Sequence, residues 1–214
     1  MFESFLLLML ASASKSRHYL LKKMGIDHLV MASDLDEENF EKFDAPKMVE
    51  ELALAKANAV ASKLVLNTPE DSIYKQIDSV LGCDSVFVFQ GEICGKPKDY
   101  KEAIERLQRM SSNSGFLITG HALLFRPAIF ESRKEFSFNG LIQKVVSTRV
   151  DFVDMTYEEI DQYVSTGEPL HCAGGFALEG RGGMLISAIN GCYSNVIGLS
   201  LPWLKKAMYV AGLG

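Results

Sequence analysis

The stretch VLGCDSVFVF, residues 80–89, predicts the centre of the fold, because it is an apolar run that contains a single charge, Asp84. Such a run is typical of a strand buried inside a sheet. An ionised carboxylate in that position is normally paired, protonated or bound to a cation. Lys96 and Lys98 follow closely. The combination indicates a site for a metal and an anion, and the plainer alternative is an aspartate that caps the following turn or accepts backbone amides.

On both sides of this stretch, strand and helix patterns alternate along the chain. We expect strands at 5–11, 29–32, 78–89, 116–125, 143–152 and 184–189, and helices at 17–24, 48–64, 100–110, 156–164 and 202–210. Ser16 is the expected cap of the first helix, and Thr156 with Glu159 has capping-box spacing. Gln90-Gly91-Glu92 predicts a hairpin turn. Strands joined by hairpins as well as by helices predict an α/β or α+β fold with a mixed sheet.

The composition is that of an ordinary soluble globular protein, with 48% hydrophobic and 23% charged residues in a chain of 214. The length fits one domain, or one two-lobed domain with a cleft. A net charge of −5 argues against a nucleic-acid polymer or a membrane surface as partner, but not against a phosphate ligand. The cysteines lack C-x-x-C spacing and the histidines form no H-E-x-x-H, so we expect no structural zinc site.

The apolar run at 5–11 is followed by Ala11-Ser12-Ala13, which resembles a signal-peptidase site. A signal peptide requires a positively charged residue before its apolar run, and no lysine or arginine precedes this one. The run is also too short to span a bilayer. We therefore expect a buried first strand and a cytoplasmic protein.

The loop after this strand, LASASKSR at 10–17, predicts an anion site. Small hydroxyl residues stand at the carboxyl end of a strand, just before a helix, where free amides and the helix dipole attract anions. Ser12 and Ser14 can donate hydrogen bonds, and Arg17 can bind a phosphate with two donors. The alternative is a serine-rich turn with a solvated arginine.

Two lysines are further candidates. Lys56 lies among alanines and leucines in the expected helix 48–64, where its ammonium either reaches solvent or points into a cleft. Lys96 precedes Pro97 after a tight turn, which limits its backbone freedom, although a surface lysine is the default interpretation.

The segment 171–183, HCAGGFALEGRGG, has five glycines around Glu179. Glycines let a backbone approach a planar or phosphorylated ligand closely, and Glu179 can accept hydrogen bonds from the donor edge of a base. The alternative is a long flexible loop, although its apolar residues are not typical of a flexible linker.

In their order and spacing these motifs resemble the Maf family of nucleoside triphosphate pyrophosphatases. The stretches that carry the likeness are LASASKSR, LALAKANAV, GCDSV, GKPKDYKEAIERL, ITGHALL, EEIDQYVSTGEPLHCAGGFALEGRGG and GCYSNVIGLSL. The resemblance implies an α/β fold, with a mixed β-sheet flanked by helices and two lobes around a central cleft, similar to inosine-triphosphate pyrophosphatases. It implies a single domain over 1–214, hydrolysis of a nucleoside triphosphate to monophosphate and pyrophosphate, a divalent cation (Mg²⁺ or Mn²⁺) and a homodimer.

The same resemblance assigns roles to individual residues. Asp84 matches the proton acceptor of the family and, with Lys56 and Lys96, forms the implied catalytic set. The resemblance also places Ser14, Arg17, Thr119 and Glu37 at phosphate or metal positions, and Ser16, Ser85 and Glu179 at positions of substrate choice. From the chemistry of the residues themselves, Ser12 is a further phosphate candidate, and Asp84 with Glu37 the candidate metal ligands. Whether Asp84 removes a proton or only holds a metal stays open.

The specificity positions favour a purine. Members of the family that prefer dTTP and UTP usually have Arg, Gln and Lys at the positions that Ser16, Glu179 and Cys172 occupy here. This chain departs from them at all three positions. Members that act on 7-methyl-GTP share Cys-Ala-Gly and the glutamate, but tend to have an aromatic residue at Ser16. An ionised carboxylate accepts hydrogen bonds and so suits the guanine N1–H/N2–H₂ edge better than uracil O4. Lys15, in place of the usual Pro, leaves the shape of the phosphate loop open.

Three functions fit these residues. The first is a pyrophosphatase that removes modified or non-canonical nucleotides, which the retained Asp84, Lys56 and Lys96 favour. The second is a regulatory nucleotide-binding protein that affects septum formation and cell division. The third is a nucleotide-activated phosphatase that releases one phosphate at a time.

Overall fold

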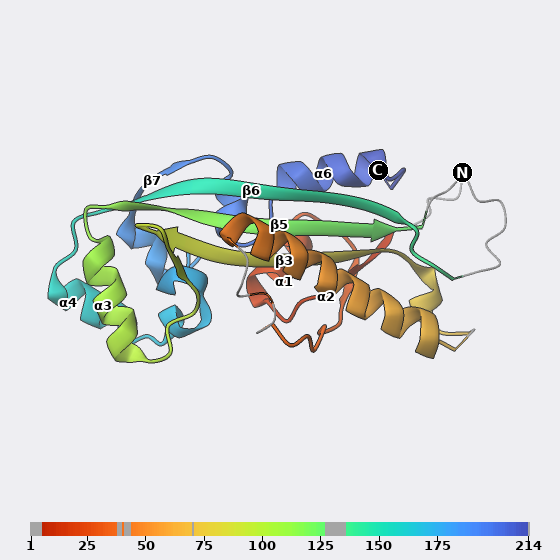
Figure 1. Ribbon diagram of the computed structural model, residues 1–214, viewed down its shortest axis with the longest axis horizontal. Coiled ribbons are helices and arrows are strands. Elements are labelled where there is room, and N and C mark those ends of the chain that lie inside the picture. The colour runs from red at the N-terminus through yellow and green to blue at the C-terminus, as the bar shows by residue number, and fades with distance from the viewer. Residues whose placement is uncertain (1–5, 38–39, 41–43, 70, 127–135, 214) are drawn as a thin grey trace. The chain divides into compact units, whose positions relative to one another are not determined.

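The computed structural model describes residues 6–37, 40, 44–69, 71–126 and 136–213 (Figure 1). Its strands form a seven-stranded sheet in the order β2-β1-β3-β5-β6-β7, with β4 paired to β3. The strands are β1 (Leu7–Leu10), β2 (His28–Val30), β3 (Ile77–Phe89), β4 (Glu92–Cys94), β5 (Ser114–Phe125), β6 (Gly140–Phe152) and β7 (Ile186–Asn190). β1 runs parallel to β2 and β3, whereas β4 is antiparallel to β3 and β7 to β6. The sheet is therefore mixed, as predicted.

Helices flank this sheet, which confirms the α/β class. They are α1 (Lys15–Lys23), α2 (Ala45–Asn67), α3 (Tyr100–Met110), α4 (Tyr157–Val164), α5 (Tyr193–Val196) and α6 (Leu201–Val210). Short 3₁₀ turns are η2 (Ile73–Gln76), η3 (Glu168–His171), η4 (Ala173–Gly175) and η5 (Arg181–Leu185). Within the ranges that the structure describes, no helix has the length and apolar character needed to cross a membrane.

The chain divides into two compact units. Unit 1 comprises Met1–Asp84, Gly120–Val145 and Leu201–Gly214, and unit 2 comprises Ser85–Thr119 and Val146–Ser200. Three of the boundaries in the sequence fall inside β3, β5 and β6, and the fourth falls at the start of α6. That residues 1–214 work as a single domain stays a prediction.

In unit 1, helix α2 packs directly on strands β3 and β5. A Cβ atom added to Gly82 would lie 2.1 Å from the Ala53 carbonyl oxygen, and one added to Gly120 would lie 2.0 Å from that of Val49. Ala53 and Ala57 are fully buried on the same helix face. Glycine in the strands and alanine in the helix thus bring the two backbones close together, which places the side chains beside that contact.

In unit 2, three phenylalanines form the centre of the core. The rings of Phe87, Phe152 and Phe176 meet edge to face, with centroids 5.1 to 5.9 Å apart. Gly174 lies against Phe87, because a Cβ atom there would be 2.7 Å from the Phe87 Cβ. The glycine-rich segment is therefore packed on the core, and its interpretation as a flexible loop is wrong.

Several predicted bounds are confirmed. α3 has the predicted limits, Thr156 and Glu159 form the predicted capping box of α4, and β4 follows the predicted hairpin turn. α2 extends beyond the expected 48–64 at both ends. Pro46 lies in its first turn, as expected of a proline at a helix start, and Asp44 caps the helix by accepting from the Lys47 amide.

The first and last predicted strands are shorter than expected. In the described part of 5–11 the strand is Leu7–Leu10, and residue 5 lies outside the described residues. The expected strand 184–189 begins only at Ile186, because Arg181–Leu185 forms a 3₁₀ turn. Close to the ends of an element, hydrogen bonds to distant groups decide which residues extend it.

The cap of the first helix also differs from the prediction. α1 begins at Lys15, and Ser14, not Ser16, is its cap: the Ser14 hydroxyl accepts from the Arg17 amide at 3.4 Å. Ser14 has the extended backbone of an N-cap (φ −67°, ψ 117°), whereas Ser16 lies inside the first turn.

Candidate active site

In unit 1, an ion cluster with a largely buried Lys56–Asp84 pair joins strand β3 to helix α2. The Lys56 ammonium lies 2.6 Å from Asp84 Oδ1 and 2.7 Å from Glu37 Oε1. The side chains of Lys56 and Asp84 are only 12% and 13% exposed, while that of Glu37 is 54% exposed. Asp84 lies in the interior of β3, so its interpretation as a turn cap is wrong. The cluster gives the strand acid the charged partner that its burial requires.

The helix–strand contact explains how these residues meet. Lys56 lies three residues along α2 from Ala53, and Asp84 lies two residues along β3 from Gly82, whose missing side chain allows the contact. Lys56 and Asp84 are 28 residues apart in the sequence, yet their side chains share a hydrogen bond. The interpretation of Lys56 as a lysine that merely reaches solvent is therefore wrong.

The donor set of this cluster fits a divalent cation that arrives with its substrate. Two carboxylates already converge on one positive charge, the Lys56 ammonium. Mg²⁺ in nucleotide enzymes is typically held by one or two carboxylates together with waters and phosphate oxygens. The part of the chain that the structure describes has no group of three or more His, Cys, Asp or Glu side chains that could hold a metal. Asp84 and Glu37 thus match a shared site better than a closed cage built by the protein alone.

The predicted phosphate loop forms the start of α1. The Arg17 guanidinium donates to the Ser12 hydroxyl at 3.1 Å, and the Ser14 amide donates to the same oxygen at 3.2 Å. Arg17 is only 9% exposed, so its interpretation as a solvated arginine is wrong. The Ser12 hydroxyl oxygen accepts both bonds, and the Ser14 hydroxyl oxygen accepts from the Arg17 amide, so each hydroxyl keeps its own proton for donation to an anion. Lys15 is exposed and Ser16 half-buried in the first turn of the helix.

The pKa of the buried Cys83 thiol depends on three charged neighbours, Arg17, Lys56 and Asp84. The pKa of the Cys83 thiol is raised to about 11, mainly by burial; Arg17 and Lys56 oppose the rise, and Asp84 adds to it. The thiol therefore stays protonated near neutral pH and is no nucleophile. Arg17 of the phosphate loop and the Lys56–Asp84 pair therefore all lie close enough to Cys83 to influence its thiol.

In unit 2, Ser85 and Thr119 meet. Their hydroxyl oxygens are 2.9 Å apart, and the Thr119 hydroxyl also donates to the Asn195 carbonyl oxygen at 3.4 Å. Because Thr119 has one proton and gives it to Asn195, Ser85 donates in the bond between the two hydroxyls. Thr119 is fully buried, so its hydroxyl holds Ser85 in place.

Lys96 and Glu179, also in unit 2, are exposed, and both influence the half-buried Cys172. The pKa of the Cys172 thiol is raised to about 11, mainly by burial and also by the Glu179 and Glu168 carboxylates, while Lys96 opposes the rise. Among the described residues, neither the Lys96 nor the Glu179 side chain has a hydrogen bond or ion pair. Both charges are thus available to a ligand.

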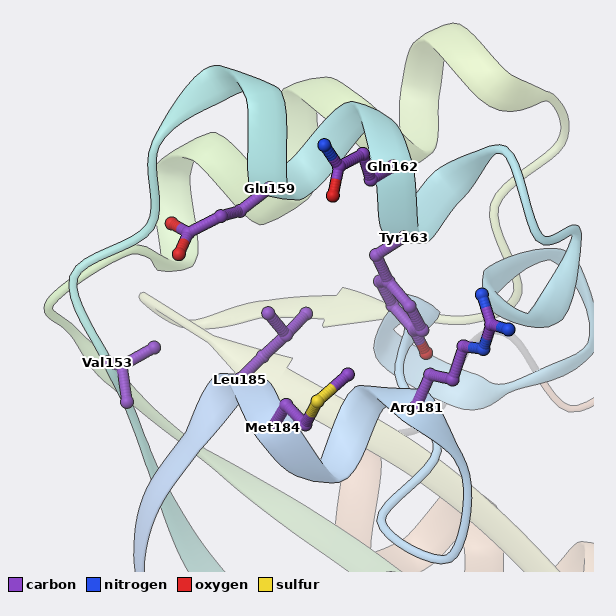
Figure 2. A pocket seen from close by; sticks show the side chains of 7 residues that line it. All are labelled: Val153, Glu159, Gln162, Tyr163, Arg181, Met184 and Leu185. Atoms are coloured by element: carbon purple, nitrogen blue, oxygen red, sulfur yellow. The ribbon is translucent and has the colours of Figure 1, made fainter.

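A pocket of about 210 Å³ lies elsewhere in unit 2 (Figure 2). Its lining residues are Val153, Glu159, Gln162, Tyr163, Arg181, Met184 and Leu185. None of the residues that the sequence singled out for catalysis, phosphate binding or substrate choice lines this pocket.

Residues 7–210 match the family model described as Maf-like protein. The chain belongs to the Maf-like protein family. A nucleoside triphosphate pyrophosphatase of Parasynechococcus marenigrum is 52% identical over 202 residues, 94% of each chain. One of Prochlorococcus marinus is 46% identical over 207 residues, 97% of this chain and 98% of the relative. The solved Ham1 protein of Staphylococcus aureus covers 69% of this chain and 72% of its own, with 17% identity and a TM-score of 0.40, too weak a likeness to support a conclusion.

Sequence reasoning missed three residues of this Maf-like chain that hold the candidate residues in place. Asn195 is fully buried; its side-chain amide donates to the Leu117 and Val146 carbonyls and to the Thr148 hydroxyl. Tyr163 and Glu168 bind the backbone on both sides of Glu179. Polar residues next to a glycine-rich segment were the available signal, but their partners lie too far along the chain for a local pattern to identify them.

Proposed function

We propose that this protein is a nucleoside triphosphate pyrophosphatase, which hydrolyses the α–β phosphoanhydride to a nucleoside monophosphate and pyrophosphate. The observation that carries the proposal is the cluster of largely buried Lys56 and Asp84 with the more exposed Glu37. Arg17 influences the same Cys83 thiol as Lys56 and Asp84 do. Relatives named nucleoside triphosphate pyrophosphatase that align over more than nine-tenths of the chain support it.

In this reaction a water oxygen attacks the α-phosphorus. The bond between that phosphorus and the α–β bridging oxygen breaks, and pyrophosphate leaves with the bond electrons. Asp84 accepts the proton that the water loses, which makes it the general base. The triphosphate offers the Lys56 ammonium an anionic partner besides Asp84 and Glu37, and this frees Asp84 for the water.

The other residues bind and neutralise the substrate. Arg17, Lys56 and Lys96 offset the charge of the phosphates, and the Ser12 and Ser14 hydroxyls donate to phosphate oxygens. A divalent cation, Mg²⁺ or Mn²⁺, held by Asp84 and Glu37 would neutralise phosphate charge and acidify a bound water. Thr119 assists by fixing Ser85.

We further propose a preference for purines, including modified ones such as 7-methyl-GTP, and a role in removing modified or non-canonical nucleotides. Glu179 is an exposed acceptor without a partner among the described residues, and it suits the donor edge of guanine. By family resemblance we also propose a cytoplasmic homodimer with a single domain over residues 1–214.

Product analysis tests the proposed reaction. The protein is incubated with a panel of canonical and modified triphosphates and Mg²⁺ or Mn²⁺, and monophosphate, diphosphate, pyrophosphate and phosphate are quantified. Monophosphate with equimolar pyrophosphate is the expected result. Diphosphate with phosphate would instead identify a stepwise phosphatase, and tight binding without turnover would identify a regulatory nucleotide-binding protein.

A further inference from the structure

We propose that Glu168 and Tyr163 are positioning residues for substrate selectivity, because they fix the turn that presents Glu179. The inference rests on the proposed function, in which Glu179 recognises the base. Neither residue belongs to the set that the sequence assigned to catalysis, phosphate binding or substrate choice.

The Glu168 carboxylate binds the chain just after Glu179. Its Oε2 accepts from the Arg181 amide at 3.1 Å, and its Oε1 accepts from the Gly182 amide at 2.9 Å. Oε1 also accepts from the Tyr163 hydroxyl at 2.8 Å. Three donors therefore hold one carboxylate, and two of them are backbone amides of the segment that follows Glu179.

The Tyr163 hydroxyl binds the chain just before Glu179. It accepts from the Ala177 amide at 3.1 Å while it donates to Glu168. Figure 2 shows the Tyr163 ring directed toward the segment that carries Arg181. The two anchored amides, of Ala177 and Arg181, lie two residues on either side of Glu179. The pair thus fixes both ends of a very short stretch of backbone.

The stretch between these anchors is itself closed. The Gly180 amide donates to the Ala177 carbonyl at 3.3 Å, so Leu178 and Glu179 are the central residues of a tight turn. Leu178 packs against the hydrophobic core of unit 2. Glu179 is therefore the exposed tip of a turn that has both ends anchored and one neighbour buried.

Two glycines show how closely the backbone lies against the pair. A Cβ atom at Gly180 would be 2.2 Å from Glu168 Oε2, and one at Gly182 would be 2.5 Å from the Tyr163 hydroxyl. The sequence alone suggested that such glycines let the backbone approach a ligand. At positions 180 and 182 they instead let it approach Glu168 and Tyr163.

The direction of each hydrogen bond in this network is fixed. Tyr163 is only 5% exposed, and burial together with the Glu168 carboxylate raises the pKa of its phenol. The hydroxyl therefore keeps its proton, donates it to Glu168 and accepts from Ala177. A base-reading carboxylate must be held within a fraction of an ångström of its productive position, which this network supplies.

Substrate discrimination tests the inference. The variants Glu168→Gln and Tyr163→Phe are compared with wild type for kcat/KM on GTP and on UTP. An amide in place of the carboxylate loses one backbone acceptor, and phenylalanine loses both bonds of the hydroxyl. In each variant we expect the ratio of kcat/KM on GTP to kcat/KM on UTP to fall roughly tenfold, the scale of a lost hydrogen bond to a charged group.

Matched controls lie on α4, the helix that carries Tyr163. Tyr157→Phe and Glu158→Gln make the same chemical changes at exposed positions of α4 and should leave the ratio unchanged. Thermal unfolding is followed for every variant. A purely structural role would lower stability and the rates on both nucleotides together, without changing the ratio.

A second comparison tests whether Tyr163 and Glu168 affect selectivity through Glu179. In a Glu179→Gln background, Tyr163→Phe and Glu168→Gln should cause no further change in the ratio, because the group that they position is gone. If Glu168→Gln does not fold, Tyr163→Phe, which keeps the carboxylate and its two backbone amides, carries the test alone. Folded variants with wild-type discrimination would overturn the inference.

The outcome also separates this inference from the proposed function. A wild-type protein that hydrolyses no triphosphate contradicts the function itself. Turnover with a ratio that Glu179→Gln does not change contradicts base recognition by Glu179. If Glu179→Gln changes the ratio and the two positioning variants do not, only the role of Glu168 and Tyr163 is refuted.

Discussion

At the scale of single residues, the chemistry depends on how a few buried charges are paired. Asp84 is tolerated inside a core strand because the Lys56 ammonium lies 2.6 Å from it. The same ammonium also pairs with Glu37, so one lysine holds the carboxylates of Asp84 and Glu37 close together. Removing one partner of a buried pair leaves the other uncompensated, which costs more than the pair gained by forming.

The Asp84→Asn variant should lose at least about a hundredfold in turnover, the usual scale for a positioned acid–base group. Asparagine keeps the shape of the side chain but neither accepts a proton nor neutralises Lys56. Steady-state hydrolysis of GTP measures the loss. Asp34→Asn is the matched control, because Asp34 pairs with Lys63 of the same helix but at the surface. Near-normal turnover in Asp84→Asn would remove Asp84 from the mechanism.

Because the pKa of the buried Cys83 thiol is raised, we predict that the protein loses stability at alkaline pH. Burial raises the pKa of its thiol from 9.0 to about 11. A pKa raised by folding means that the stabilisation is fully present below the pKa of the unfolded chain, near 9, and is lost as pH rises through about 11. Urea unfolding from pH 8 to 11 should therefore show a steeper fall in wild type than in Cys83→Ala. Identical pH profiles would contradict this role of the thiol.

At the scale of elements, close contacts between backbones place the side chains. α2 approaches β3 at Gly82 and β5 at Gly120, and both contacts leave no room for a Cβ atom. α1 begins where Ser14 caps it, and this turns Arg17 inward onto Ser12. In unit 2, the turn at Glu179 takes its shape from Tyr163 on α4 and from Glu168.

The Gly82→Ala variant should lower the free energy of unfolding by roughly 1–3 kcal/mol, the scale of an overpacked core. Its Cβ atom would press on the Ala53 carbonyl and push α2 away from β3. Because Lys56 and Asp84 lie on these two elements, kcat/KM should fall as well. Gly95→Ala is the stability control, since a Cβ atom there meets nothing within 4 Å. Equal stability of the two variants would contradict the packing argument.

At the scale of the whole molecule, a protein of net charge −5 is proposed to bind a polyanion. Long-range electrostatics therefore oppose the approach of a free triphosphate, and binding depends on the local cations and on a metal that neutralises the substrate. Arg17 and Lys56 supply positive charge in unit 1, and Lys96 supplies it in unit 2.

Removal of divalent cations should abolish triphosphate hydrolysis, and adding back Mg²⁺ or Mn²⁺ should restore it. Activity after treatment with a chelator, with and without added metal, measures this directly. Replacing Glu37 with Gln should raise the metal concentration needed for half-maximal rate, because one of two carboxylate ligands is lost. Undiminished hydrolysis in chelator would exclude the proposed metal.

Features that depend on neighbouring residues could be predicted from the sequence. The mixed α/β pattern, the limits of α3, the Thr156–Glu159 capping box and the hairpin after β3 all follow from periodicity, caps and turns. The motifs also predicted the family, which the family match confirms, whereas the roles of the individual residues stay predictions.

Which of those residues meet became clear only from the packing of the folded chain. Packing joins Asp84 to Lys56 and Glu37, and it leaves Gly180 and Gly182 to make room for Glu168 and Tyr163. The physical reason is that a helix or a turn is encoded by residues a few positions apart. An ion pair or an anchored turn depends instead on where packing brings distant segments together, and a local pattern does not contain that information.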